Sequence, residues 1–255
     1  MSARMRLTVF AVAGASLAVL LGYAVFGLPP FGTFHGPYTD YLLAHAVGQR
    51  HGTNVVAAVT FDYRGFDTMG EEFILFSAVS GVALLLRASR DSEYERPVDA
   101  QPVESLTAVG LLASPVFVVV GLWLVAHGPV TPGGGFQGGV VLAAGALLIY
   151  IAGQYRGFRT ATDEAVLDAA ESVGAGGFIV VGLVGMGLGA AFLHNFLPYG
   201  RIGHIDSSGA TAVINAAVGL EVAAAFVLLV TEFTEEVTSA RAHRKLRDDA
   251  DREGA

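Results

Sequence analysis

The 255-residue sequence contains no cysteine, a single lysine and few charged residues, which make up 15% of the chain. The absence of cysteine excludes disulfide bonds and metal sites with thiolate ligands. Because Lys245 is the only lysine and stands in no glycine-rich loop, a phosphate-binding loop is absent. No serine has a histidine and an acid in a plausible sequence context for nucleophilic catalysis. We therefore expect no metal site, no cofactor, no catalytic set, no ATP hydrolysis and no nucleic-acid partner.

Hydrophobic residues make up 53% of the chain and form long uncharged runs, whereas the charges gather in short stretches. A helix needs about 20 apolar residues to cross the hydrocarbon core of a bilayer. Runs near this length cover residues 7–28, 106–126, 140–152, 173–193 and 210–230, and an interrupted run covers 54–86. The sequence therefore predicts an all-α integral membrane protein with about six transmembrane helices. The first run opens like a secretory signal but is too long for one, so we expect a retained span, with cleavage as the alternative.

The interrupted run carries a polar cluster inside an otherwise apolar stretch. Its charged members are Asp62, Arg64, Asp67, Glu71 and Glu72. Irregular backbone at membrane depth is tolerated only where protein or water covers it, so we expect a short helix, a break near Gly65 and then a spanning helix. Carboxylates in a membrane normally pair, take up a proton or meet an ion. Asp62, Asp67 and Glu71 are therefore candidate ion or proton sites, and a salt bridge of Arg64 that only fixes the broken helix is the alternative.

The distribution of charge predicts two modules and their orientation. A charged linker at residues 91–104 separates a two-span module at 1–90 from a four-span module at 105–236, and a tail of mixed charge follows at 237–255. Six crossings place most arginines on one side of the membrane, so both termini are expected in the cytoplasm. The loops on the other side contain six histidines, namely His35, His45, His51, His127, His194 and His204. Loop histidines are usually polar surface or contacts between proteins, and a proton relay is the alternative.

A glycine-rich stretch, HGPVTPGGGFQGG, covers residues 127–139. Its glycines satisfy the pattern G-x-G-x-x-G, but the strand and the acidic residue of a dinucleotide-binding unit are missing, which excludes that function. Pro132 suits the first turn of a helix. Gly135 and Gly139 form a small-xxx-small pair that favours close helix packing. The alternative is an unwound segment whose carbonyls, together with the amide of Gln137, face a hydrated ion path.

The last apolar run contains one acid, Glu221, between Leu220 and Val222. A lone acid at this depth must face protein or water. We expect it to be a proton site or, as the alternative, a protonated and hydrogen-bonded group that serves helix packing. Asp168 and Glu171 precede the run at 173–193, and we interpret them as structural because acids suit a helix N-terminus.

Three segments resemble components of one family of membrane complexes. The motif at residues 127–139 resembles the signature of the B-type component (MnhB or MrpB) of the multisubunit Na⁺/H⁺ antiporters. The segments HNFLPYG at 194–200 and SSGATAVINAAVGLEVAA at 207–224 are similar to the third loop and last span of the same component. The segment TNVVAAVTFDYRGFDTMGE at 53–71 resembles the E-type module (MbhE) found at the end of the large A-type antiporter component. The chain thus looks like a fusion of that module with a B-type component.

This resemblance implies a membrane subunit of an antiporter that moves Na⁺ out of the cell and H⁺ in, located in the plasma membrane. It implies large A- and D-type subunits and small C-, E-, F- and G-type subunits as partners, besides the lipid bilayer. The implied ion-path or proton sites are Asp62, Asp67, Glu71 and Glu221. The implied motif at the start of the adjoining helix comprises His127, Pro132, Gly133, Gly134, Gly135, Phe136, Gln137, Gly138 and Gly139. A structural adaptor in a related respiratory or hydrogenase-type complex is the alternative.

Overall fold

The computed structural model describes residues 3–28, 32, 36–89, 104–153, 157–159 and 162–253, without the side chains of 3, 88, 89 and 237–253. Regular structure in these ranges is entirely helical, which confirms the all-α prediction. The helices are α1 (Ala3–Phe26), α2 (Pro37–Arg50), α3 (Val55–Ala58), the π-helix η1 (Val59–Tyr63), α4 (Gly65–Ser89), α5 (Glu104–Ala126), α6 (Gly135–Ile151), α8 (Glu164–Gly187) and α9 (Ala210–Glu253). The predicted linker at 91–104 lies almost wholly outside the described residues.

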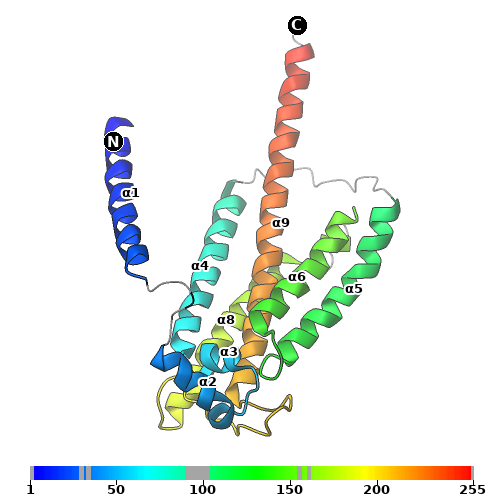
Figure 1. Ribbon diagram of the computed structural model, residues 1–255. Helices are drawn as coiled ribbons and strands as arrows, with labels where there is room; N and C mark the ends of the chain where they lie inside the picture. Colours follow the sequence, from blue (N-terminus) through cyan, green and yellow to red (C-terminus); the bar gives the residue numbers. More distant parts are fainter. Residues whose placement is uncertain are drawn as a thin grey trace. The chain divides into compact units, whose positions relative to one another are not determined.

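Five of these helices, α1, α4, α5, α8 and α9, are long and apolar enough to cross a membrane, and α6 is a shorter apolar helix. Together they match the predicted number of about six spans. The chain forms two compact units, Met1–Tyr41 and Leu42–Ala255. The first contains α1 (dark blue in Figure 1), whose apolar side chains such as Phe10 and Val19 are exposed. Such a helix needs lipid or other protein around it.

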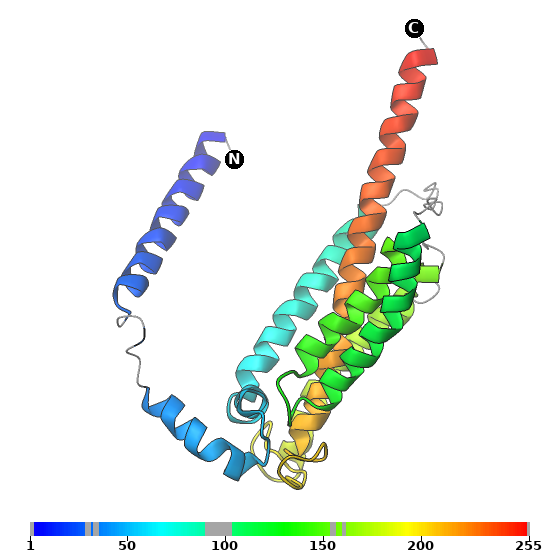
Figure 2. The ribbon, with the colours of Figure 1, turned by 45° about the vertical axis from the view of Figure 1, so that its right-hand side comes forward.

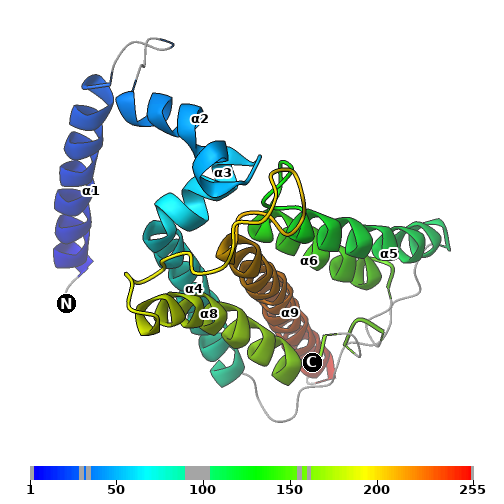
Figure 3. The ribbon, with the colours of Figure 1, turned by 90° about the horizontal axis from the view of Figure 1, so that it is seen from below.

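The second unit is a bundle of helices around α9. Ile214, Val218, Val222 and Leu228 of α9 are buried, and α9 contacts α4, α5, α6 and α8. Seen end-on, α9 lies between α6 on one side and α4 and α8 on the other, while α5 lies along α6 (Figure 3). Figure 2 shows that α9 continues well beyond the ends of its neighbours. The part of the tail at 237–253 is therefore helical in its backbone.

The predicted break near Gly65 is present. After α3, the chain forms one π-helical segment, η1, and Arg64 then leaves helical geometry with φ −127° and ψ 30° before α4 begins. The Thr68 hydroxyl donates a hydrogen bond of 2.6 Å to the carbonyl of Thr60, which gives a polar group of the irregular turn a partner. The expectation of a loop around His45 was wrong, because residues 37–50 form α2.

Glycines allow α6 to approach both of its neighbours closely. A Cβ at Gly135 would lie 2.4 Å from the Asn215 carbonyl oxygen, and one at Gly139 would lie 2.8 Å from Cβ of Val222, both in α9. A Cβ at Gly138 would meet the Gly121 carbonyl of α5 at 2.8 Å. The packing prediction for Gly135 and Gly139 is therefore confirmed.

Two expectations about helix starts were wrong. Pro132 lies in a bend ahead of α6 and not in its first turn, because Gly133 (φ +146°) and Gly134 (φ +143°) keep the chain out of helical geometry until Gly135. The helix α8 begins at Glu164 and not near residue 173, since Asp163 caps it by accepting hydrogen bonds from the amides of Ala165 and Val166. Asp168 and Glu171 consequently lie inside the helix.

Candidate functional site

A cavity of about 290 Å³, here called the break cavity, lies beside the irregular segment α3–η1. Its polar and motif side chains come from η1, α4 and the start of α6, and they include Thr60, Glu71, Glu72, Gly133, Phe136 and Gln137. The structure thus brings an acid of the broken helix together with three members of the glycine-rich motif. Glu71 is exposed, whereas Glu72 is 5% exposed. The cavity offers carboxylate and amide oxygens to a cation or a proton.

Asn54 positions the loop that carries the motif. Its side-chain amide donates to the carbonyls of Gly128 (2.8 Å) and Thr131 (2.9 Å), while its Oδ1 accepts from the Ala57 amide and so caps α3. The Thr53 hydroxyl donates to the carbonyl of Val130. These bonds fix the 127–134 loop against the start of α3.

Asn215 holds the first turn of α6. Its Oδ1 accepts a hydrogen bond of 2.8 Å from the Gly135 amide, and its Nδ2 donates to the Thr211 carbonyl within α9. The side chain is 0% exposed, so this bond gives a partner to one of the amides that a helix start leaves unsatisfied. The glycines beside it make that approach possible.

Asp62 lies in a second cavity, the Arg50 cavity, of about 390 Å³. Arg50 forms an ion pair with Asp62 (Nε to Oδ1, 2.9 Å), and Asn195 donates to the other oxygen at 2.8 Å. Arg50 also donates to the hydroxyl of Tyr199 at 2.7 Å. Burial lowers the pKa of Arg50, but the charge of Asp62 and the contact with Tyr199 outweigh it and raise the pKa. The pKa of Tyr199 is raised by burial and by Asp62.

Asp67 pairs with Arg64 in the same cavity, at 2.5 Å from Nη2, with both side chains more than half exposed. This pair is the Arg64 salt bridge considered from the sequence, whereas Asp62 takes Arg50 instead. The loops expected on one side of the membrane meet here, since the Ser208 hydroxyl donates to the Arg50 carbonyl and His51 contacts the Gly200 carbonyl.

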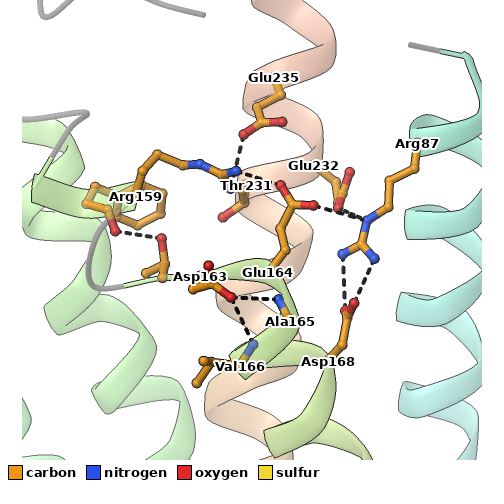
Figure 4. A network of polar contacts seen from close by, with 12 residues as sticks. Arg87, Arg159, Asp163, Glu164, Ala165, Val166, Asp168, Thr231, Glu232 and Glu235 are labelled. Carbon is orange, nitrogen blue, oxygen red and sulfur yellow. Dashed lines mark hydrogen bonds and ion pairs between the residues drawn. The ribbon is translucent and has the colours of Figure 1, made fainter. Parts of the chain in front are cut away.

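A third group of polar residues lies at the opposite end of α4, shown in Figure 4. Arg87 contacts Asp168 with two nitrogens (2.8 and 3.1 Å) and Glu232 with a third (2.6 Å). Arg159 contacts Glu164 at 2.7 Å and Glu235 at 3.2 Å. These ion pairs join α4, α8, α9 and the segment between α6 and α8. The adjoining Arg87 cavity, of about 480 Å³, is also lined by Asp168 and Glu171.

Glu221 lies in the core of the bundle and not in any of these cavities. It is 0% exposed, and neither carboxyl oxygen has a hydrogen-bond partner among the described residues. The hydrogen-bonded packing role considered for it is therefore not what the geometry shows. Its charge interacts with those of Glu72 and Glu171. No group of three histidine, aspartate or glutamate side chains in the described ranges is placed to hold a metal ion.

The structure separates the residues singled out from the sequence into distinct places. Glu71, Gly133, Phe136 and Gln137 share the break cavity, Asp62 and Asp67 share the Arg50 cavity, and Glu221 lies apart. His127 stacks on Trp123 and contacts the Trp123 carbonyl, so it does not join the break cavity. Sequence reasoning missed three asparagines that make the main polar contacts: Asn54, Asn195 and Asn215. Asn215 had the same signal as Glu221, a polar residue within an apolar run.

Two family models match the chain one after the other. The model described as a domain related to the MnhB subunit of Na⁺/H⁺ antiporters matches residues 105–228, and the MbhE model, for the E-type component of MBH, matches residues 2–100. An uncharacterized protein of Methanocaldococcus jannaschii is 32% identical over 67% of this chain and 73% of its own length. A probable K⁺/H⁺ antiporter protein of the combined A/B type from Rhizobium meliloti is 26% identical over 95% of this chain, which spans 26% of that protein.

Two solved structures share the fold. One chain of the membrane-bound sulfane sulfur reductase, an archaeal respiratory membrane complex, superimposes with a TM-score of 0.70 and 29% identity over 88% of this chain and 97% of that chain. One chain of the Mrp complex from Dietzia sp. DQ12-45-1b superimposes with a TM-score of 0.67 and 24% identity over 91% of this chain and 26% of that chain. The chain therefore belongs to the family of MnhB-related membrane subunits, and it joins an MbhE segment to the MnhB-related domain in one polypeptide.

Proposed function

We propose that the chain is a subunit of a multisubunit monovalent cation/proton antiporter that moves Na⁺ out of the cell and H⁺ in. On this proposal it lies in the plasma membrane with both termini in the cytoplasm, since the arginines favour that side. Its partners would be large A- and D-type subunits and small C-, E-, F- and G-type subunits. The chain would contribute to the sodium path and to assembly, and would carry out no covalent chemistry of its own.

The break cavity is the observation that carries this proposal. Thr60, Glu71 and Gln137 place hydroxyl, carboxyl and amide oxygens around one space at a break between helices. Oxygen ligands suit small hard cations, and broken helices are where membrane transporters form ion sites. Because three acidic or histidine ligands do not converge within the described ranges, we expect passage of a partly hydrated ion and not tight binding.

Replacing Glu71 with glutamine tests the role of the cavity. The complete set of subunits is expressed in membrane vesicles without other antiporters, and ΔpH is followed after Na⁺ is added. Glu71→Gln keeps the size of the side chain but removes its charge, so we expect Na⁺-driven exchange to fall about tenfold or more, which is at least about 1.4 kcal/mol. Glu104→Gln, at the exposed start of α5, is the matched control and should exchange like the unmodified complex. Full exchange by an assembled Glu71→Gln complex would remove this role.

A second candidate function is that of a structural adaptor in a respiratory or hydrogenase-type complex. The observation that favours it is the match to one chain of the sulfane sulfur reductase complex over 97% of that chain. Variants at Asp67, Glu71 and Phe136 separate the two functions. In an adaptor these variants lose complex assembly, whereas in a protein that forms the ion path they assemble and fail to exchange.

A further inference from the structure

Glu221 is the least satisfied acid in the described part of the bundle. Its side chain is 0% exposed, and both of its carboxyl oxygens lack a hydrogen-bond partner there. A buried carboxylate without a hydrogen bond or a cation is very costly, so a group in this position is expected to carry a proton. Such a residue is hard to explain by packing, since an apolar side chain would fill the same volume without that cost.

Two further buried acids approach Glu221 from neighbouring helices. Its charge interacts with that of Glu72 from α4 and with that of Glu171 from α8. Glu72 and Glu171 are 5% and 3% exposed, and each has one carboxyl oxygen without a partner among the described residues. Gly174 lets α8 approach closely here, because a Cβ on it would lie 2.6 Å from the Glu221 backbone nitrogen. Each of three adjoining helices thus supplies one acid to the same part of the core.

The two outer acids of this group line different cavities. Glu72 lines the break cavity and interacts with Glu71, which lines it too. Glu171 lines the Arg87 cavity, where its charge interacts with those of Asp168 and Arg87. The break cavity adjoins the first turns of α4 and the Arg87 cavity adjoins its last turns, so Glu221 is placed between spaces toward opposite ends of the bundle.

We propose that Glu72, Glu221 and Glu171 form a proton relay through the core between α4, α8 and α9, linking the break cavity to the Arg87 cavity. Glu221 gives its proton to the carboxylate of Glu171, directly or through water, and takes another from Glu72. One O–H bond breaks and one forms in each transfer, so a single proton moves and each acid returns to its starting state. The direction and the driving force rest on the proposed antiport function.

The chemistry of the group favours a proton over a metal ion as the species that moves. Glu221 has no cationic or hydrogen-bonding partner in the described part of the chain, and the acids described there do not converge as a metal site does. Arg87 lies at one end of the relay, where it interacts with Glu171 and can stabilise a carboxylate that has just released its proton.

The first test uses the complete complex in vesicles with Glu221→Gln, Glu171→Gln and Glu72→Gln. Glutamine has nearly the size of a protonated glutamate but cannot pass a proton on, so a packing role would tolerate it and a relay would not. We expect each variant to assemble with all its partners and to lose Na⁺-driven ΔpH about tenfold or more, equivalent to about 1.4 kcal/mol or more. Glu104→Gln should retain exchange. Wild-type exchange by an assembled Glu221→Gln complex would overturn the relay.

The second test does not depend on sodium transport. Dicyclohexylcarbodiimide reacts with protonated carboxyl groups in apolar surroundings and leaves a stable adduct that mass spectrometry locates. Applied to the purified intact complex, it should label Glu221, with less label when Glu171 or Glu72 is replaced by glutamine. Absence of label on Glu221 across the pH range in which the complex is intact would overturn the relay. If the unmodified complex labels at Glu221 but exchanges no monovalent cation for protons, the proposed function fails while the relay stands.

Discussion

Gly174 offers a measurable test of how closely α8 packs against α9 beside the buried acid. A Cβ at this position would lie 2.6 Å from both the nitrogen and Cβ of Glu221 and 2.7 Å from the carbonyl oxygen of Ala217. Two of these atoms belong to the α9 backbone, so they cannot rotate away as a flexible side chain can. Ordinary contact begins near 3.4 Å, so Gly174→Ala must move the helices apart by about 0.8 Å. Overpacking of this kind costs about 1–3 kcal/mol.

Gly176→Ala is the matched control, because no atom lies within 4 Å of a Cβ at Gly176. Both changes lie inside α8 and gain about the same helix propensity, at most about 1 kcal/mol, so their difference isolates the packing cost. At about 2–4 °C per kcal/mol, Gly174→Ala should lower the midpoint of heat-induced aggregation of the detergent-solubilised chain by several degrees relative to Gly176→Ala. Equal midpoints for the two variants would show that α8 and α9 are not in the close contact described above.

Two polar contacts give further expectations. Arg87→Met removes a cation that faces Glu232, 1% exposed, and should destabilise the chain by about 3 kcal/mol; Arg87→Met with Glu232→Gln should recover part of that in the same aggregation assay, and no recovery would argue against this ion pair. Asn215→Leu removes the acceptor of the Gly135 amide and should cost about 1–3 kcal/mol, whereas Val213→Leu, on an exposed position of α9, should leave the midpoint unchanged.

The spans could be predicted because lipid imposes a simple rule on composition. The runs without charge at 106–126 and 210–230 lie inside α5 and α9, and the polar cluster after Phe61 marks the break that the structure contains. The start of α8 could not be predicted this way. Its acids, Glu164 and Asp168, look like a polar loop in sequence, and only their ion pairs with Arg159 and Arg87 from other parts of the bundle make a helix there favourable.

The candidate site was predictable in its members more than in its grouping. Glu71 and Gln137 were singled out from separate segments, and nothing in their spacing shows that they line one cavity. Asp62 and Asp67 are close in the sequence but take different arginines, since Arg50 reaches Asp62 from α2. The approach of Glu72, Glu221 and Glu171 depends on how α4, α8 and α9 pack, which hydrophobic runs do not specify.

Water access to the two cavities of the proposed relay is the most direct test of a path through this chain. The chain has no native cysteine, so single cysteines placed in it can be labelled with membrane-impermeant thiol reagents and located by mass spectrometry. Thr60→Cys lines the break cavity, Ser80→Cys lines the Arg87 cavity, and Ile74→Cys, 72% exposed on α4, is the control on an apolar surface. In the assembled complex, Thr60→Cys should be labelled from the outer face and Ser80→Cys from the cytoplasmic face, with Ile74→Cys unlabelled. If neither cavity position reacts from either face, the cavities are closed to water and the chain carries no ion path.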